Sequence, residues 1–328
     1  MAIDILNLQP TTISRDLRGK YVLIYGQPKA GKTSLACQFP NNLLLAFEHG
    51  YNAIAGAHVV DINKWSDFKL VLRQLSKPEA QAMYSTVTID TVSIAWDLCE
   101  QYICAQAGVQ KLADIPWGQG YTQLSAEFEN TLRQITMMGY GVVLITHVAT
   151  RKEVKGDSEI EYYTPALNKR CYPICNRIVD IIGYIDVVWD EDGNSTRWLY
   201  TRQTPTIMAG SRFKYLAPKI KFGYHELVDA IASAIEQSEK LDGAQVVDTV
   251  THQVEEKLNY NDLRKEAQTL WTQLVGTGDN ANEEMARRIM KRVEMIFGRP
   301  VKLSEITEDQ VDLYQLVVLE MRDLAAEN

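Results

Sequence analysis

Long apolar runs are missing from this 328-residue sequence. No window approaches the roughly 20 apolar residues that a membrane-spanning helix needs. The first twenty residues lack the basic start and apolar run of a secretory signal. Cysteine is scarce as well, and its odd count of 5 gives no disulfide framework. These absences predict a cytoplasmic protein.

Zinc-site spacing is also missing. Cys171 and Cys175 are separated by three residues, but no second pair of cysteines or histidines lies nearby in the sequence. We therefore expect Cys37, Cys99, Cys104, Cys171 and Cys175 to be reduced structural thiols.

Excess positive charge is the third absence, because the net charge is −8. The acidity is concentrated in Glu239–Asn328, which holds 18 of the 42 acidic residues but only 11 of the 34 basic ones. The rest of the chain is close to neutral. It can carry a local basic groove, because binding to nucleic acid follows local charge and not the total.

The stretch "LIYGQPKAGKTSLA" has the spacing of a phosphate-binding loop. An apolar strand, Tyr21–Gly26, precedes the loop, and a helix is expected to follow it. The glycines let consecutive N–H groups wrap a phosphate, Lys32 adds a charge for the β and γ phosphates, and Thr33 can ligate Mg²⁺. The alternative is a chance glycine-rich turn. The predicted nucleotide-binding residues are Gly26, Gln27, Pro28, Lys29, Ala30, Gly31, Lys32, Thr33 and Ser34.

Apolar strands alternate with helical patterns through the first two thirds of the chain. Helices are expected at about Ile94–Ala107 and Thr122–Met138, with strands between the helical segments. This alternation predicts an α/β fold with a mostly parallel sheet flanked by helices, and ligands at the carboxyl ends of its strands. A hairpin is expected around Asp192-Gly193-Asn194, and a polar loop at Arg151–Arg170.

Polar residues stand at three of these strand ends. Asp90 ends "VTID" and could hold Mg²⁺ together with Thr33. Glu48, in "AFEHG", could activate water, and His147, in "VVLITH", could contact the γ-phosphate. Each could instead be an ordinary residue at the end of a strand.

The order of these motifs resembles the RecA-like P-loop ATPase core. The segments "YGQPKAGKTSLA", "LLLAFEHGYNAIAG", "TIDTVS", "WGQGYTQL" and "VLITHV" carry the resemblance, over about Arg18–Val228. Within that superfamily the chain is most similar to phage-encoded RecA-core nucleotide-binding proteins, some of which act as single-strand annealing or recombination ATPases. The resemblance implies ATP and Mg²⁺ as cofactors and the host cytoplasm as location. It implies catalytic roles for Lys32, Glu48 and His147, and metal binding by Thr33 and Asp90.

The resemblance further implies that Gly108–Tyr121 and Ala149–Lys169 face single-stranded DNA and that the protein forms a homo-oligomer. Tyr162 and Tyr163 could stack on bases, although a flexible solvated loop is the alternative. The candidate DNA contacts are Arg151, Lys152, Lys155, Lys169 and Arg170. A basic residue from a neighbouring subunit is also implied, with Arg202, Arg212 and Lys214 as candidates and plain surface cations as the alternative.

The expected organisation is an ATPase core at 1–237, a linker at 238–258 and an acidic helical domain at 259–328. In the last helix, Leu313, Leu316, Val317, Glu320 and Leu324 are expected to lie around a partly apolar face. The predicted function is a DNA-stimulated ATPase in phage-type recombination or annealing. The alternatives are a nucleotide-dependent switch that binds a protein partner through the helical domain, or a DnaB-like helicase or loader motor.

Overall fold

A computed structural model describes residues 13–14, 19–155, 158–247, 259–276 and 281–326. The chain divides into two compact units, one within Pro10–Val254 and the other within Glu255–Asn328. Among the described helices, none combines the length and the apolar composition that crossing a membrane requires.

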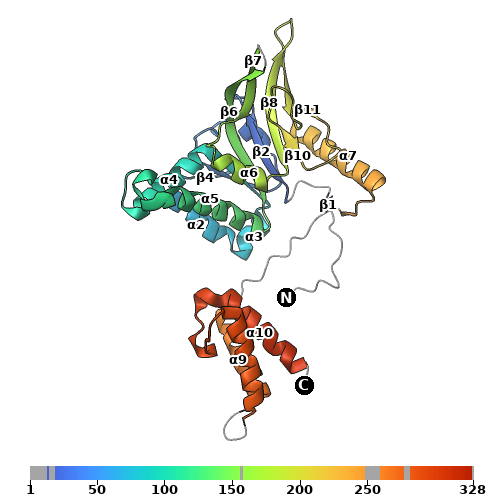
Figure 1. Cartoon of the computed structure of the whole chain (residues 1–328). Coiled ribbons are helices and arrows are strands. Elements are labelled where there is room, and N and C mark those ends of the chain that lie inside the picture. Colours follow the sequence, from blue (N-terminus) through green and yellow to red (C-terminus); the bar gives the residue numbers. More distant parts are fainter. Residues whose placement is uncertain (1–12, 15–18, 156–157, 248–258, 277–280, 327–328) are drawn as a thin grey trace. The chain divides into compact units, whose positions relative to one another are not determined.

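A sheet of 10 strands forms the centre of the first unit (Figure 1). Along its main path the order is β11 (Lys219–Lys221), β9 (Ser195–Tyr200), β8 (Ile181–Trp189), β2 (Tyr21–Gly26), β6 (Gly141–Lys155), β5 (Thr86–Asp90), β3 (Asn42–Ala46) and β4 (His58–Asp61). The strands from β8 to β4 pair in parallel, whereas β9 and β11 pair antiparallel. The expected α/β class with a mostly parallel sheet is confirmed.

Both faces of this sheet are covered, which explains why its strands are continuously apolar. On β2, Leu23 and Tyr25 face one cluster of buried side chains, and Val22 and Ile24 face another. The first cluster includes residues of α2 (Trp65–Leu75), α4 (Val92–Ala107), α5 (Gln119–Met137) and α6 (Cys171–Ile178). The second includes residues of α1 (Lys32–Ala36) and α7 (Tyr224–Asp242). The helices therefore hold β2, and the loop that follows it, between two packed layers.

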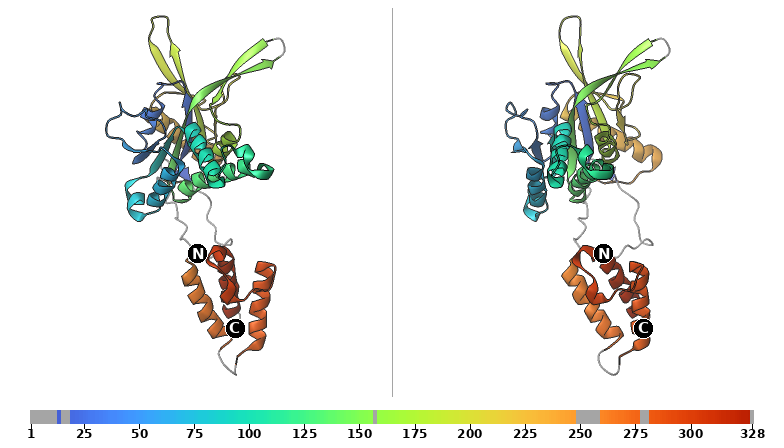
Figure 2. Two further views of the ribbon diagram at one scale, coloured as in Figure 1. Left: turned by 90° about the vertical axis from the view of Figure 1, so that its left-hand side faces the viewer. Right: turned by 60° about the vertical axis from the view of Figure 1, so that its left-hand side comes forward.

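Two antiparallel hairpins project from the same end of the sheet (Figure 2). The first hairpin is formed by β6 and β7 (Ser158–Pro165), and the second hairpin by β8 and β9. The β8–β9 hairpin turns at the expected Asp192-Gly193-Asn194. The expectation of a polar loop at Arg151–Arg170 is wrong over much of that range. There, β6 continues to Lys155 and pairs with β7 (Ser158–Pro165) in the first hairpin. Charged residues occupy both of its faces, so the strands lack the apolar–polar alternation that would have revealed them. Register pairs Lys152 with Glu161, an opposite-charge pair that favours the hairpin.

Shorter elements complete this unit: α3 (Pro78–Met83), the 3₁₀ turns η1 (Leu112–Asp114) and η2 (Pro116–Gly118), and β10 (Gly210–Ser211), which pairs with β8. A separate parallel ribbon joins β1 (Ile13–Ser14) to β12 (Val246–Val247). Helix α7 thus enters the expected linker, and residues 248–258 of that linker lie outside the described residues.

The unit within Glu255–Asn328 is helical, as expected. Helices α8 (Tyr260–Leu274), α9 (Glu283–Phe297) and α10 (Val311–Ala326) pack around their own core, with turns η4 (Leu303–Glu305) and η5 (Glu308–Gln310) between α9 and α10. The predicted face of the last helix is partly wrong, because Leu316 is 49% exposed. Helix α10 packs against both α8 and α9, and this packing buries a different set of its residues: Tyr314, Val317, Val318, Met321 and Leu324.

Candidate nucleotide-binding site

The phosphate loop connects the carboxyl end of β2 to the start of α1. Gly26 leaves no room for a side chain, since a Cβ there would lie 2.8 Å from the Ile185 carbonyl oxygen. Lys29 and Gly31 have φ values of 64° and 100°, in the left-handed region that shapes the loop. The Ala30 N–H donates to the Gln27 carbonyl at 3.2 Å, which closes the turn.

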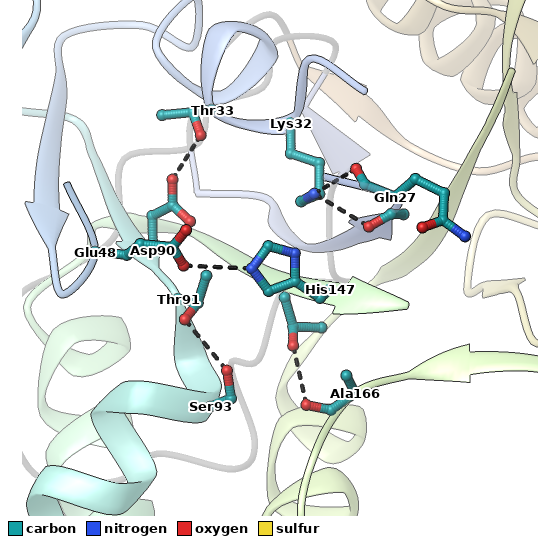
Figure 3. Close-up of polar contacts among 11 residues, drawn as sticks. Gln27, Lys32, Thr33, Glu48, Asp90, Thr91, Ser93, His147 and Ala166 are labelled. Atoms are coloured by element: carbon teal, nitrogen blue, oxygen red, sulfur yellow. Dashed lines mark hydrogen bonds and ion pairs between the residues drawn. The ribbon is translucent and has the colours of Figure 1, made fainter. Parts of the chain in front are cut away.

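Lys32 is buried at the first residue of α1 (Figure 3). Its Nζ donates to the carbonyl oxygens of Gly26 at 3.1 Å and of Gln27 at 2.9 Å. Burial lowers the pKa of this ammonium, while the charges of Asp90 and Glu48 oppose that shift. The loop backbone therefore holds the Lys32 ammonium in a position where it can bind a polyphosphate.

Asp90 ends β5, and its Oδ2 accepts a hydrogen bond from the Thr33 hydroxyl at 2.6 Å. Burial raises the pKa of this carboxyl, and the hydrogen bond from Thr33 and the charge of Lys32 counteract the rise. Mg²⁺ prefers oxygen ligands and is usually held by one or two carboxylates together with substrate phosphates and water. The hydroxyl of Thr33 and the carboxylate of Asp90 fit that donor set.

Glu48 and His147 meet from different strands. Glu48 Oε2 lies 3.3 Å from His147 Nε2, although 99 positions separate them in the chain. The backbone N–H groups of Phe47 and Glu48 both donate to the Asp90 carbonyl, which ties the end of β3 to that of β5. His147 pairs with Gly26 across β6 and β2. Glu48 therefore lies beside the phosphate loop with its carboxylate partly exposed, where it can reach water.

The three candidate basic residues near the second hairpin all bind within this chain. Arg202 donates to the carbonyl oxygens of Ser211, Phe213 and Lys214. Arg212 pairs with Asp180 at 3.2 Å, and Lys214 pairs with Asp242 at 2.8 Å. A role for any of them in a neighbouring subunit stays a prediction.

A different arginine reaches the phosphate loop. Arg197, on β9, donates from Nη1 to the Ala30 carbonyl oxygen at 3.3 Å. Its guanidinium also stacks on the Phe222 ring, 4.6 Å from the ring centre. Sequence reasoning missed Arg197, because the residue is 167 positions from Ala30 and carries no motif.

The candidate DNA contacts lie on the first hairpin and at the start of α6. Arg151 and Lys152 are exposed on β6, and the side chain of Lys155 lies outside the described residues. Lys169 is exposed, and the Arg170 guanidinium stacks on Tyr121, 4.9 Å from its ring centre. This last contact joins Tyr121, at the end of one segment that was expected to face DNA, to the residue directly after the other segment.

Aromatic side chains near these residues differ in their availability. The expected stacking residue Tyr163 instead packs on Tyr184, with the rings 5.7 Å apart and 7° from parallel. Trp117 was not predicted, yet it is 94% exposed and has a φ of 60°. An indole this exposed contributes little to packing, so it is available to a ligand.

Four of the five cysteines, Cys99, Cys104, Cys171 and Cys175, are buried, whereas Cys37 is partly exposed. Cys171 and Cys175 are buried, and their sulfur atoms lie 3.8 Å apart. Within the described residues, no group of three or more His, Cys, Asp or Glu side chains is arranged to hold a metal ion.

The chain is similar to a known family of domains and to a known protein. Residues 18–213 match the model of a family described as an AAA domain. The chain is also 31% identical over 340 residues to the SPbeta prophage-derived uncharacterized protein YorG of Bacillus subtilis (strain 168), an alignment that covers 100% of both chains. The family match includes the phosphate loop, Glu48, Asp90 and His147, and the α/β fold is that of P-loop ATPases, which use ATP and Mg²⁺. The chain belongs to the AAA domain family of P-loop ATPases.

Proposed function

We propose that this protein is a RecA-like ATPase that acts on single-stranded DNA in phage-type recombination or annealing. One observation carries the proposal: β6 bears His147 at the nucleotide site and then continues into the hairpin that carries Arg151 and Lys152. A change at His147 therefore has a direct route along β6 to a hairpin with exposed basic side chains. The prophage origin of the relative supports the phage setting.

The chain's own residues supply the chemistry of hydrolysis. Lys32 and the N–H groups of the phosphate loop bind the β and γ phosphates of ATP, and Thr33 and Asp90 hold Mg²⁺, which neutralises the charge that develops on the phosphates. The Glu48 carboxylate orients a water molecule and accepts its proton. Because His147 lies 3.3 Å from Glu48, it responds to the loss of the γ-phosphate and passes the change along β6.

The DNA would bind across the first hairpin and the adjoining start of α5 and α6. Arg151, Lys169 and Arg170 supply positive charge, and Trp117 supplies a ring on which a base can stack. We further propose that ATP promotes assembly of a homo-oligomer, in which subunits share the DNA.

The decisive experiment measures ATP turnover by the wild type and Lys32→Ala, each with and without oligo-dT, followed by sizing with ATP. We expect oligo-dT to stimulate the wild type, Lys32→Ala to be inactive, and ATP to increase the size of the wild type. Unstimulated turnover together with no ATP-dependent retention of oligo-dT would refute the DNA-binding part.

A second candidate function is a nucleotide-dependent switch that binds a protein partner through the helical unit. A cavity of about 650 Å³ between α8, α9, η4 and α10 favours it, with Trp271 and Leu303 in its wall and Arg264 and Lys302 at its edge. Its size is typical of ligand pockets. Deleting Asn259–Asn328 would abolish such a function and leave a DNA activity of the ATPase unit in place, so the deletion separates the two candidates.

A further inference from the structure

Arg197 and Phe222 form one unit against the outer side of the phosphate loop. The Phe222 N–H donates to the Arg197 carbonyl oxygen at 3.0 Å, which fixes the two residues side by side. The guanidinium lies over the Phe222 ring, and this stacking restricts where its nitrogen atoms can point. From this supported position, Nη1 donates to the Ala30 carbonyl oxygen.

The hydrogen bond from Arg197 to the Ala30 carbonyl oxygen also constrains the direction of the Gly31 N–H. The Ala30 carbonyl and the Gly31 N–H belong to the same planar trans peptide, so they point in opposite directions. A donor that holds the carbonyl toward the outside of the loop therefore directs the Gly31 N–H toward the inside. Inward N–H groups are the part of a phosphate loop that binds the phosphates.

Close packing at Gly31 strengthens the contact. Gly31 has a φ of 100°, and a Cβ there would lie 2.6 Å from Arg197 Nη1 and 3.1 Å from Phe222 Cζ. The glycine thus permits both the left-handed backbone and the close approach of the arginine.

We propose that Arg197 is a positioning residue for the phosphate loop, which aims the Gly31 N–H at the β-phosphate of the nucleotide. This inference rests on the nucleotide-binding part of the proposed function and not on DNA binding. Arg197 acts through the Ala30–Gly31 peptide and takes no direct part in bond cleavage. It differs in this respect from an arginine that stabilises charge on the γ-phosphate.

The test compares ADP and ATP, because the β-phosphate is common to both nucleotides. For Arg197→Ala we expect about tenfold weaker binding of each, the size typical for loss of a hydrogen bond from a charged donor. Turnover at saturating ATP should stay within about twofold of wild type, since the lost contact is equal in the ground and transition states. Arg197→Met keeps an apolar side chain for packing on Phe222 but has no donor, so it should match Arg197→Ala in affinity even if the alanine variant folds poorly.

Lys219→Ala is the matched control. Lys219, on β11, also stacks on aromatic rings, 4.4 Å from Trp198 and 5.0 Å from Tyr200, but among the described residues it makes no hydrogen bond or ion pair with the phosphate loop. Its loss should leave the affinity for ADP unchanged.

Titration with ADP in the absence of DNA provides the measurement, with thermal melting of each variant alongside. Unchanged ADP affinity in Arg197→Met would overturn the proposal, whether or not the melting temperature falls. A large drop in turnover with unchanged ADP affinity would also overturn it, because that pattern belongs to a residue acting on the γ-phosphate. Unstimulated turnover together with no ATP-dependent retention of oligo-dT would refute DNA binding while leaving this result intact.

Discussion

The nucleotide-binding edge and the first hairpin belong to the same sheet, and β6 runs through both, yet they are built in opposite ways. At the edge, Lys32 and Asp90 are buried and each is hydrogen bonded within the protein. On the hairpin, Arg151 and Lys152 are exposed, and Lys152 is paired in register with an acidic residue, Glu161. Chemistry on a phosphate requires fixed groups of perturbed pKa, whereas binding a polymer requires accessible charge.

Removing the buried cation should have the largest effect. We expect Lys32→Ala to lower kcat/KM for ATP by at least about 1,000-fold, because no other side chain supplies charge inside the loop in the described contacts. Steady-state turnover provides the measurement. Lys29→Asn is the control, since Lys29 is exposed on the same loop and asparagine tolerates its left-handed backbone. Equal losses in the two variants would contradict the distinction between buried and exposed lysines.

Glu48→Gln should have the next largest effect. The amide retains the shape of the side chain but cannot accept a proton, so turnover at saturating ATP should fall about 100-fold. ATP affinity, measured by equilibrium titration, should change little. Glu79→Gln, at an exposed position in the first turn of α3, is the control. A variant that loses affinity but keeps its turnover would assign Glu48 to binding and not to water activation.

Changes on the hairpin should act on DNA alone. We expect Arg151→Ala combined with Arg170→Ala to weaken oligo-dT binding about tenfold at low salt and to reduce the dependence of the affinity on salt concentration. ATP turnover without DNA should be unchanged, because within the described part of the chain neither residue makes a hydrogen bond or ion pair with the phosphate loop. Fluorescence anisotropy over a range of salt concentrations measures the first effect. Arg73→Ala, an exposed arginine on α2, should leave binding as it is.

The smallest expected effect is on stability, which Asp90→Asn should increase. Burial raises the pKa of Asp90 in the folded protein, so ionisation of this carboxyl opposes folding. The cost is absent below the unfolded pKa, develops as pH rises through the folded pKa, and is complete above it. At neutral pH we expect Asp90→Asn to stabilise the nucleotide-free protein by about 1 kcal/mol, or about 2–4 °C in melting temperature.

Thermal melting without Mg²⁺ or nucleotide checks this effect, which should shrink as the pH is lowered. The same variant should lose Mg²⁺-dependent hydrolysis. Lower stability at neutral pH would show that the bond to Thr33 outweighs the cost of the buried charge.

Prediction from the sequence succeeded where a signal is local. The strand before the phosphate loop and helices α4 and α5 could be predicted within a few residues, because apolar spacing over a short window decides them. The first hairpin could not, since its polar strands are held by backbone pairing with each other. The buried face of α10 was partly missed for a similar reason: two neighbouring helices select it.

The sequence by itself determined the phosphate loop, because glycine spacing, Lys32 and Thr33 act within nine consecutive residues whose backbone follows from their own chemistry. It also placed Asp90 at the end of β5 and Glu48 just after β3, whereas the expected strand end at His147 is wrong, because β6 continues to Lys155. Only the tertiary structure decided which of these side chains touch, and that Arg197 reaches Ala30. Contacts across 57, 99 and 167 positions depend on strand order and packing, which no short window of sequence contains.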